Sequence, residues 1–216
     1  MQHLFNYALE QSVAAAKFEA ANKARVWDLR SASCVRILQS NGEVIEGDGG
    51  EVGSRHNTVP FMNELIHAMA LDPLGKLLFT SFKDDVRVWD LDRSGVYGKL
   101  VMASKNRESE VSCLVVDDPS SSSASSFRVF TGTRDHCVKM YEVPKSGSGI
   151  TQATAEMTPP HDHSITCLLP FAGHLFTASK DLIRHAHSDA INELCSNSSL
   201  LFSASSDQTV GFWRSP

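Results

Sequence analysis

The sequence has no closely spaced pair of cysteines. Its five cysteines stand far apart, at Cys34, Cys113, Cys137, Cys167 and Cys195, and no CxxC motif occurs. A zinc ribbon or a thioredoxin-like redox site needs such a pair, so neither is indicated. Cys113, Cys167 and Cys195 lie in apolar runs, which predicts small, buried, reduced thiols of a cytosolic protein.

Long apolar runs and an excess of positive charge are also missing. No stretch of about 18 apolar residues occurs, so no membrane span is expected. The first residues lack a charged leader and an unbroken apolar core, so no signal peptide is expected. The net charge of -5 argues against a general nucleic-acid-binding protein, because such proteins carry a basic excess.

Two catalytic motifs are missing as well. Without a P-loop GxxxxGK[ST], the chain has no means of hydrolysing ATP in that way, and without GxSxG it has no hydrolase elbow. The glycine-rich segment 47–53 is acidic and no helix is expected after it, so it is interpreted as a flexible loop and not a phosphate loop. A Ser205, His187 and Asp207 hydrolase triad is the enzyme alternative; we predict no enzyme.

What the sequence does contain is a repeat. Short runs of alternating apolar and polar residues that lead to an aromatic occur within 25–30 (RVWDLR), 86–92 (VRVWDLD), 137–143 (CVKMYEV) and 209–215 (TVGFWRS). Such alternation indicates half-buried strands.

A tight turn opened by aspartate recurs in the same frame. The four turn residues are Asp84, Asp135, Asp181 and Asp207, each following an apolar strand that ends in Thr or Ser and small residues. Aspartate suits the turn because its carboxylate accepts hydrogen bonds from nearby backbone N–H groups. With a further apolar strand upstream, each unit is predicted to form strand, turn, strand, aspartate turn and strand.

This unit resembles the WD40 repeat, whose four-stranded blades form β-propellers. The resemblance covers roughly residues 25–215 and implies an all-β fold. It also implies a structural hydrogen-bond network in each blade, made of a histidine, a Ser or Thr, the turn aspartate and an aromatic. In the last repeat these are His187, Ser205, Asp207 and Trp213, and His161 with Asp181 precede them.

The two earlier repeats offer only part of this network. One has Thr133, Asp135 and Tyr141, with Arg107 where the histidine is expected; the other has Asp84 and Trp89, with Met62 at that place. The resemblance gives all of these residues a structural role, not a catalytic one.

The array is predicted to be incomplete. A closed propeller of seven repeats needs roughly 280 residues, and the chain has 216. We expect about four to five blades in 25–216, loop insertions at 40–60 and 118–126, and one blade truncated near 181–187 by about 15 residues. Residues 1–24 are Ala-rich with helical spacing, which predicts a helical extension. The chain is interpreted as a fragment, a splice variant or an imperfect gene model, with sheet edges left open.

The order of the motifs narrows the family. NELIHAMALDPLGKLLF, TGTRDHCVKMYEV and PPHDHSITCL follow one another, which resembles the C-terminal WD40 domain of kinesin-type motor proteins, with the motor domain and coiled coil absent. The resemblance implies a non-catalytic, cytoplasmic tail module associated with microtubules, whose partners are proteins such as tubulin. A scaffold subunit of a non-cytoskeletal complex is the alternative.

Two groups of side chains suggest ligands. His161, His163, His185 and His187 show HxH spacing that suits a metal, but the network above already accounts for two of them, so we predict no metal and no cofactor. Lys83, Arg134 and Lys180 each precede a turn aspartate, and together they would favour an acidic partner such as the tails of tubulin. Ordinary solvated turn residues are the alternative, because exposed charges are common.

Overall fold

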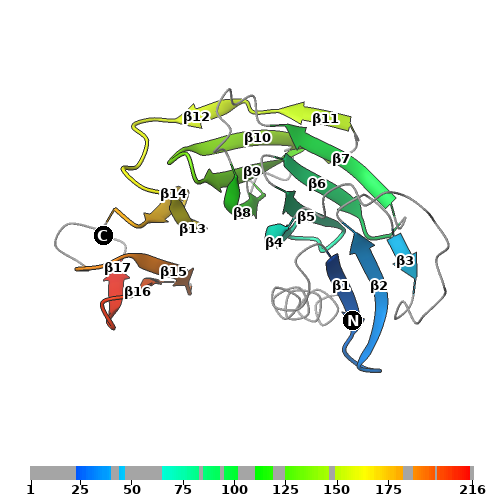
Figure 1. The fold of residues 1–216 in the computed structure, drawn as a ribbon, viewed down its shortest axis with the longest axis horizontal. Helices are drawn as coiled ribbons and strands as arrows, with labels where there is room; N and C mark the ends of the chain where they lie inside the picture. Colours follow the sequence, from blue (N-terminus) through cyan, green and yellow to red (C-terminus); the bar gives the residue numbers. More distant parts are fainter. Residues whose placement is uncertain are drawn as a thin grey trace.

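The computed structural model describes residues 23–39, 44–46, 65–82, 85–92, 95–101, 110–118, 125–145, 149–181, 187–197 and 199–214. All regular structure among them is β-strand, as predicted, in five sheets that follow one another around an open arc (Figure 1). We call these sheets blades 1 to 5. No described residue belongs to a helix capable of crossing a membrane.

Blades 1 and 2 form one end of the arc. Blade 1 contains β1 (Lys23–Asp28), β2 (Ser33–Gln39) and β3 (Val44–Glu46). Blade 2 contains β4 (Ile66–Leu71), β5 (Leu77–Phe82), β6 (Asp85–Asp90) and β7 (Gly95–Val101), all antiparallel. A fifth strand, β11 (Gly149–Gln152), adds parallel to β7.

Blades 3 to 5 complete the arc. Blade 3 contains β8 (Val111–Asp117), β9 (Ser126–Thr133), β10 (Val138–Pro144) and β12 (Ala155–Met157). Blade 4 contains only β13 (Ile165–Phe171) and β14 (His174–Ser179) within the described residues. Blade 5 contains β15 (Ile191–Ser196), β16 (Leu200–Ser205) and β17 (Val210–Arg214).

Several predicted boundaries need correction. The helix expected over 1–24 lies outside the described residues except at its end, where Lys23 and Ala24 already belong to β1. Ala24 and Val26 are both buried, as residues two apart on the same face of a strand can be. The 40–60 loop also lies mostly outside, but Val44–Glu46 pair with β2 as a strand. Of the 118–126 loop, Ser126 begins β9 and pairs with Pro144. Single-sequence patterns set such boundaries poorly because pairing partners decide them.

The first turn of blade 2 shows how a polar residue shapes a hairpin. The Asp72 carboxylate is buried and accepts hydrogen bonds from the backbone N–H groups of Leu74, Lys76 and Leu77, at 3.1, 2.6 and 2.6 Å. Burial raises the pKa of Asp72 above its ordinary value, although these three donors act to lower it. The aspartate therefore fixes the link between β4 and β5 from inside the fold.

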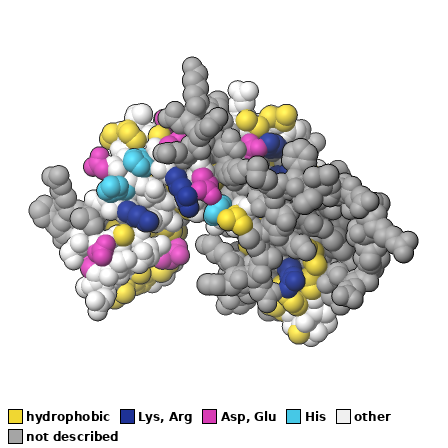
Figure 2. Space-filling view, viewed as in Figure 1, with side chains coloured by type: hydrophobic (Ala, Val, Ile, Leu, Met, Phe, Trp, Pro, Cys, Tyr) yellow, Lys and Arg dark blue, Asp and Glu magenta, His cyan; other side chains and the backbone are white. Residues whose placement is uncertain are grey.

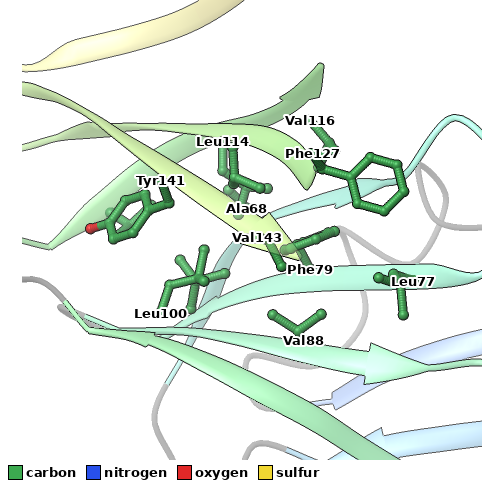
Figure 3. Close-up of a cluster of buried hydrophobic side chains, with 13 residues drawn as sticks. Ala68, Leu77, Phe79, Val88, Leu100, Leu114, Val116, Phe127, Tyr141 and Val143 are labelled. Atoms are coloured by element: carbon green, nitrogen blue, oxygen red, sulfur yellow. The ribbon is translucent and has the colours of Figure 1, made fainter. Parts of the chain in front are cut away.

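The apolar side chains pack between neighbouring blades. The largest cluster joins blade 2, through Leu77, Phe79, Val88 and Leu100, to Leu114, Phe127, Tyr141 and Val143 of blade 3 (Figure 3). Smaller clusters join blade 1 to blade 2, blade 3 to blade 4, and blade 4 to blade 5. Each blade therefore depends on its neighbours for burial, which is the rule for repeat architectures.

Candidate functional site

A chain of hydrogen bonds crosses blade 5 from its outer strand to its aspartate turn. The indole N–H of Trp213 donates to Ser203 Oγ at 3.0 Å, and Ser203 Oγ lies 2.8 Å from His187 Nε2. His187 Nδ1 lies 3.0 Å from Asp207 Oδ2. The His187 side chain is fully buried, so these polar groups satisfy one another away from water.

The charge of Asp207 sets the direction of these hydrogen bonds. The pKa of Asp207 is lowered far below its ordinary value, first by the hydroxyl of Thr209, then by the backbone N–H groups of Ser188 and Thr209 and by His187. An ionised Asp207 accepts a hydrogen bond from His187 Nδ1–H, which leaves Nε2 to accept a hydrogen bond from the Ser203 hydroxyl. Ser203 then accepts from Trp213, and every member has a partner.

The serine of the network is Ser203, so the expectation of Ser205 was wrong. The Ser205 hydroxyl instead bonds the carbonyl oxygens of Asp189 and Ala190, both at 3.0 Å. The register of β16 against β17 explains the difference. Trp213 pairs with Leu201, and Ser203 lies two residues farther along β16, opposite Gly211. Ser205 lies at the end of β16, beside the turn. A sequence signal existed: a Ser or Thr stands four residues before every turn aspartate, at Thr80, Thr131, Thr177 and Ser203.

Blade 4 holds part of the same arrangement. His161 Nδ1 lies 2.7 Å from Asp181 Oδ2, and His161 Nε2 lies 2.7 Å from Thr177 Oγ1. Burial acts to raise the pKa of Asp181, but the hydrogen bonds from His161 and the Asp162 N–H outweigh it, and the pKa is lowered. Among the described residues, no aromatic N–H reaches Thr177.

Blades 2 and 3 hold other parts. In blade 2 the buried Trp89 donates to Thr80 Oγ1 at 2.8 Å, while the turn residue Asp84 lies outside the described residues. In blade 3 Thr133 serves the turn, bonding Asp135 and, at 2.8 Å, the carbonyl of Cys137; it is the counterpart of Ser205 and not of Ser203. Tyr141 is buried in the Trp position, and burial raises its pKa to about 12.

Two of the three basic residues predicted to form an arc belong to the described part of the chain. Lys83 lies outside the described residues. Arg134 is exposed but forms an ion pair at 2.7 Å with Glu110, which also contacts His67 of blade 2. Lys180 is exposed. In the face shown by Figure 2, some of the described basic side chains lie beside acidic and histidine side chains.

The histidines and cysteines also take up separate places. His163 packs edge-on against His136, with ring centroids 6.2 Å apart, and His185 lies outside the described residues. No group of three His, Cys, Asp or Glu side chains suited to a metal occurs in the described part of the chain. Cys167 is buried as expected, but Cys195 is exposed, because it points to the face of β15 that no other described strand covers.

Comparison with known proteins identifies the repeat. The family model described as "WD domain, G-beta repeat" matches residues 182–214. Kinesin-like protein klp-12 of Caenorhabditis elegans is 37% identical over 89% of this chain and 16% of its own length. Kinesin-like protein KIF21A of Homo sapiens is 36% identical over 73% of this chain and 9% of its own length. The chain thus spans less than a fifth of these relatives.

A solved structure supports the fold alone. A chain of the Mitotic Checkpoint Complex superposes with a TM-score of 0.62 over 90% of this chain and 55% of that chain, at 13% identity. The alignment with klp-12 extends over 261 positions, 45 more than the 216 residues of this chain. The relative therefore has segments that this chain lacks.

Proposed function

We propose that this chain, a WD40-like segment similar to kinesin-like proteins, is a non-catalytic, cytoplasmic module that binds other proteins and associates with microtubules. The buried His187–Asp207 pair carries the proposal. Two groups that a hydrolase triad would use, His187 and Asp207, are instead members of a hydrogen-bond chain inside a blade. We therefore assign the function, protein binding, to the surfaces of the blades.

The turn face is the surface that we assign to tubulin. Lys180 lies exposed beside the Asp181 turn, and Arg134 lies in the equivalent position of blade 3. An acidic partner gains attraction from Lys180 directly, whereas at Arg134 it competes with Glu110. Lys180 is therefore the dominant described contact of the proposed surface, with Arg134 secondary and Lys83 a further candidate.

Microtubule co-sedimentation of the 216-residue chain tests this function. We expect binding at low salt that weakens about threefold to tenfold in Lys180→Glu, since contacts between exposed charges are modest and screened. The matched control is Lys76→Glu, an exposed lysine at the β4–β5 turn, at the opposite end of the strands. Equal binding by both variants, or none by the wild type, contradicts the proposal.

A scaffold role in a non-cytoskeletal complex is the second candidate. The likeness to a chain of the Mitotic Checkpoint Complex favours it, because the same fold there serves a different assembly. The two candidates are separated by the assay above, since a scaffold of another complex does not co-sediment with microtubules.

A further inference from the structure

We propose that the open edge of β14 in blade 4 binds an extended strand of a partner protein, and that this strand places a Trp or Tyr against Thr177. The proposal rests on the protein-binding function proposed above and adds a site and a ligand chemistry to it. Three independent features of the described residues support it.

The first feature is the strand edge. Among the described residues, β14 pairs with β13 on one side only, whereas its counterparts β5, β9 and β16 are paired on both sides. All six residues of β5 are buried, but only the last two of β14 are. An unpaired edge presents a row of backbone N–H and C=O groups, which is the template that an added strand uses.

The second feature is the incomplete hydrogen-bond chain at Thr177. The equivalent side chains Thr80 and Ser203 are 0% and 1% exposed and accept an indole N–H from Trp89 and Trp213. Thr177 is partly exposed and has His161 as its partner, without an aromatic donor among the described residues. Its proton is directed to His161 Nε2, so its oxygen lone pairs are available to a donor.

The third feature is the pair of walls beside this edge. On one side, Met140 and Met157 of blade 3 are partly buried and pack in the same cluster as Leu175 of β14. Methionine sulfur makes favourable contacts with aromatic rings. An aromatic opposite Thr177 therefore meets flexible apolar side chains suited to it.

The opposite wall is the face of blade 5 that carries Trp213. Leu194 lies opposite Ser203 in the register of blade 5 and packs against Ala178 of blade 4, so this face is turned toward blade 4. Trp213 is 37% exposed there, compared with 1% for Trp89 in the complete blade 2. An added strand would extend the interface that blades 4 and 5 already form.

The link between blades 4 and 5 is too short to supply this strand. Asp181 and His187 lie at the same end of their blades, since Ile165 pairs with Ser179 and the Thr166 hydroxyl bonds Ile191 O. Six residue steps extend at most about 22 Å. Running along the six residues of β14 and returning needs roughly 35–40 Å.

Two neighbouring sheets flank the proposed strand. Blade 4 lies between the sheet of β8–β12 and the sheet of β15–β17 (Figure 1). A strand added to the edge of β14 would therefore lie between these two sheets. The ligand is therefore an extended segment that alternates apolar and polar residues and has one aromatic N–H or O–H donor.

Fluorescence anisotropy with a synthetic peptide tests the site on the intact 216-residue chain. The probe is the labelled peptide DVRVWDLD, copied from residues 85–92, because that strand satisfies Thr80 in blade 2. We expect saturable binding that falls about tenfold when the peptide Trp is replaced by Ala, since a buried hydrogen bond and an aromatic contact are both lost.

Variants of Thr177 test whether the peptide Trp contacts this residue. Thr177→Val should weaken the Trp peptide about as much as the Ala substitution in the peptide, and the two changes should not add. Thr177→Ser retains the hydroxyl, as in blade 5, and should restore binding. Thr151→Val, on exposed β11, is the control.

Absence of peptide binding, or peptide binding that does not change in the Thr177 variants, overturns the proposal. Microtubule binding without peptide binding overturns this site alone, and the reverse result overturns only the tubulin assignment.

Discussion

Ser203 Oγ lies 3.0 Å from the indole nitrogen of Trp213, the partner that fixes its role in blade 5. Through this hydroxyl, the outer strand β17 is connected to His187 and so to the aspartate turn. One small buried residue thereby joins the strands of the blade, and the same position is held by Thr80 in blade 2.

Removal of the Ser203 hydroxyl should destabilise the fold more than removal of the Ser205 hydroxyl. Ser203→Ala leaves the buried His187 Nε2 without its partner and removes the acceptor of the partly exposed Trp213 N–H, which costs about 1–3 kcal/mol of unfolding free energy. Ser205 is only partly buried, so water replaces its bonds and the expected loss is about 0.5–1 kcal/mol. Urea unfolding followed by tryptophan fluorescence measures both values. A larger loss in Ser205→Ala contradicts the assignment.

Acid should weaken the fold through Asp207. Its pKa in the folded chain lies below the ordinary value of 3.8, so its contribution is fully present above that value and is lost as the pH falls toward the folded pKa. Asp207→Asn should therefore reduce the dependence of unfolding free energy on pH below about pH 5. Chemical denaturation at a series of pH values provides the measurement.

Asp72 serves as the contrast, because its folded pKa is raised. A raised carboxyl pKa makes stability fall as the pH rises through the window between the unfolded and folded values. Asp72→Asn should thus steepen the loss of stability on acidification. The same change of slope in both variants would show that the pKa shifts have been assigned wrongly.

The thiols should react in an order set by exposure. Cys195 is exposed, whereas Cys167 is 8% exposed and burial, followed by Glu193, raises its pKa to about 12. Because the thiolate is the reactive form, iodoacetamide at pH 8 should modify Cys195 rapidly and leave Cys167 unmodified in the folded chain. Peptide mass spectrometry reads the two sites, with Cys195→Ser as control. Early modification of Cys167 is incompatible with the packing of blades 4 and 5.

Local sequence patterns predicted much of this fold because each repeat has a turn with a recognisable sequence. Alternating residues and the turn aspartates indicated the all-β class. The offset of His161 and His187 before their strands also indicated which histidines stand beside Asp181 and Asp207, and the structure has both contacts.

Features that depend on distant pairing were beyond such patterns. The choice between Ser203 and Ser205 needed the register of β16 against β17. Strand β11 leaves blade 3 to pair with β7, where Gly98 and Gly149 approach so closely that a Cβ on Gly98 would lie 2.6 Å from Gly149 O. The partner of Arg134, Glu110, lies 24 residues earlier and across a turn, so its charge balance was not visible in the sequence.

The affinity of the 216-residue chain for microtubules, before and after proteolytic removal of the acidic tubulin tails, tests the proposed function most directly. If the turn face around Lys180 meets those tails, binding at low salt should weaken by about tenfold when they are removed, and rising salt should abolish the difference. Equal affinity for intact and trimmed microtubules, or no affinity for either, would contradict the account.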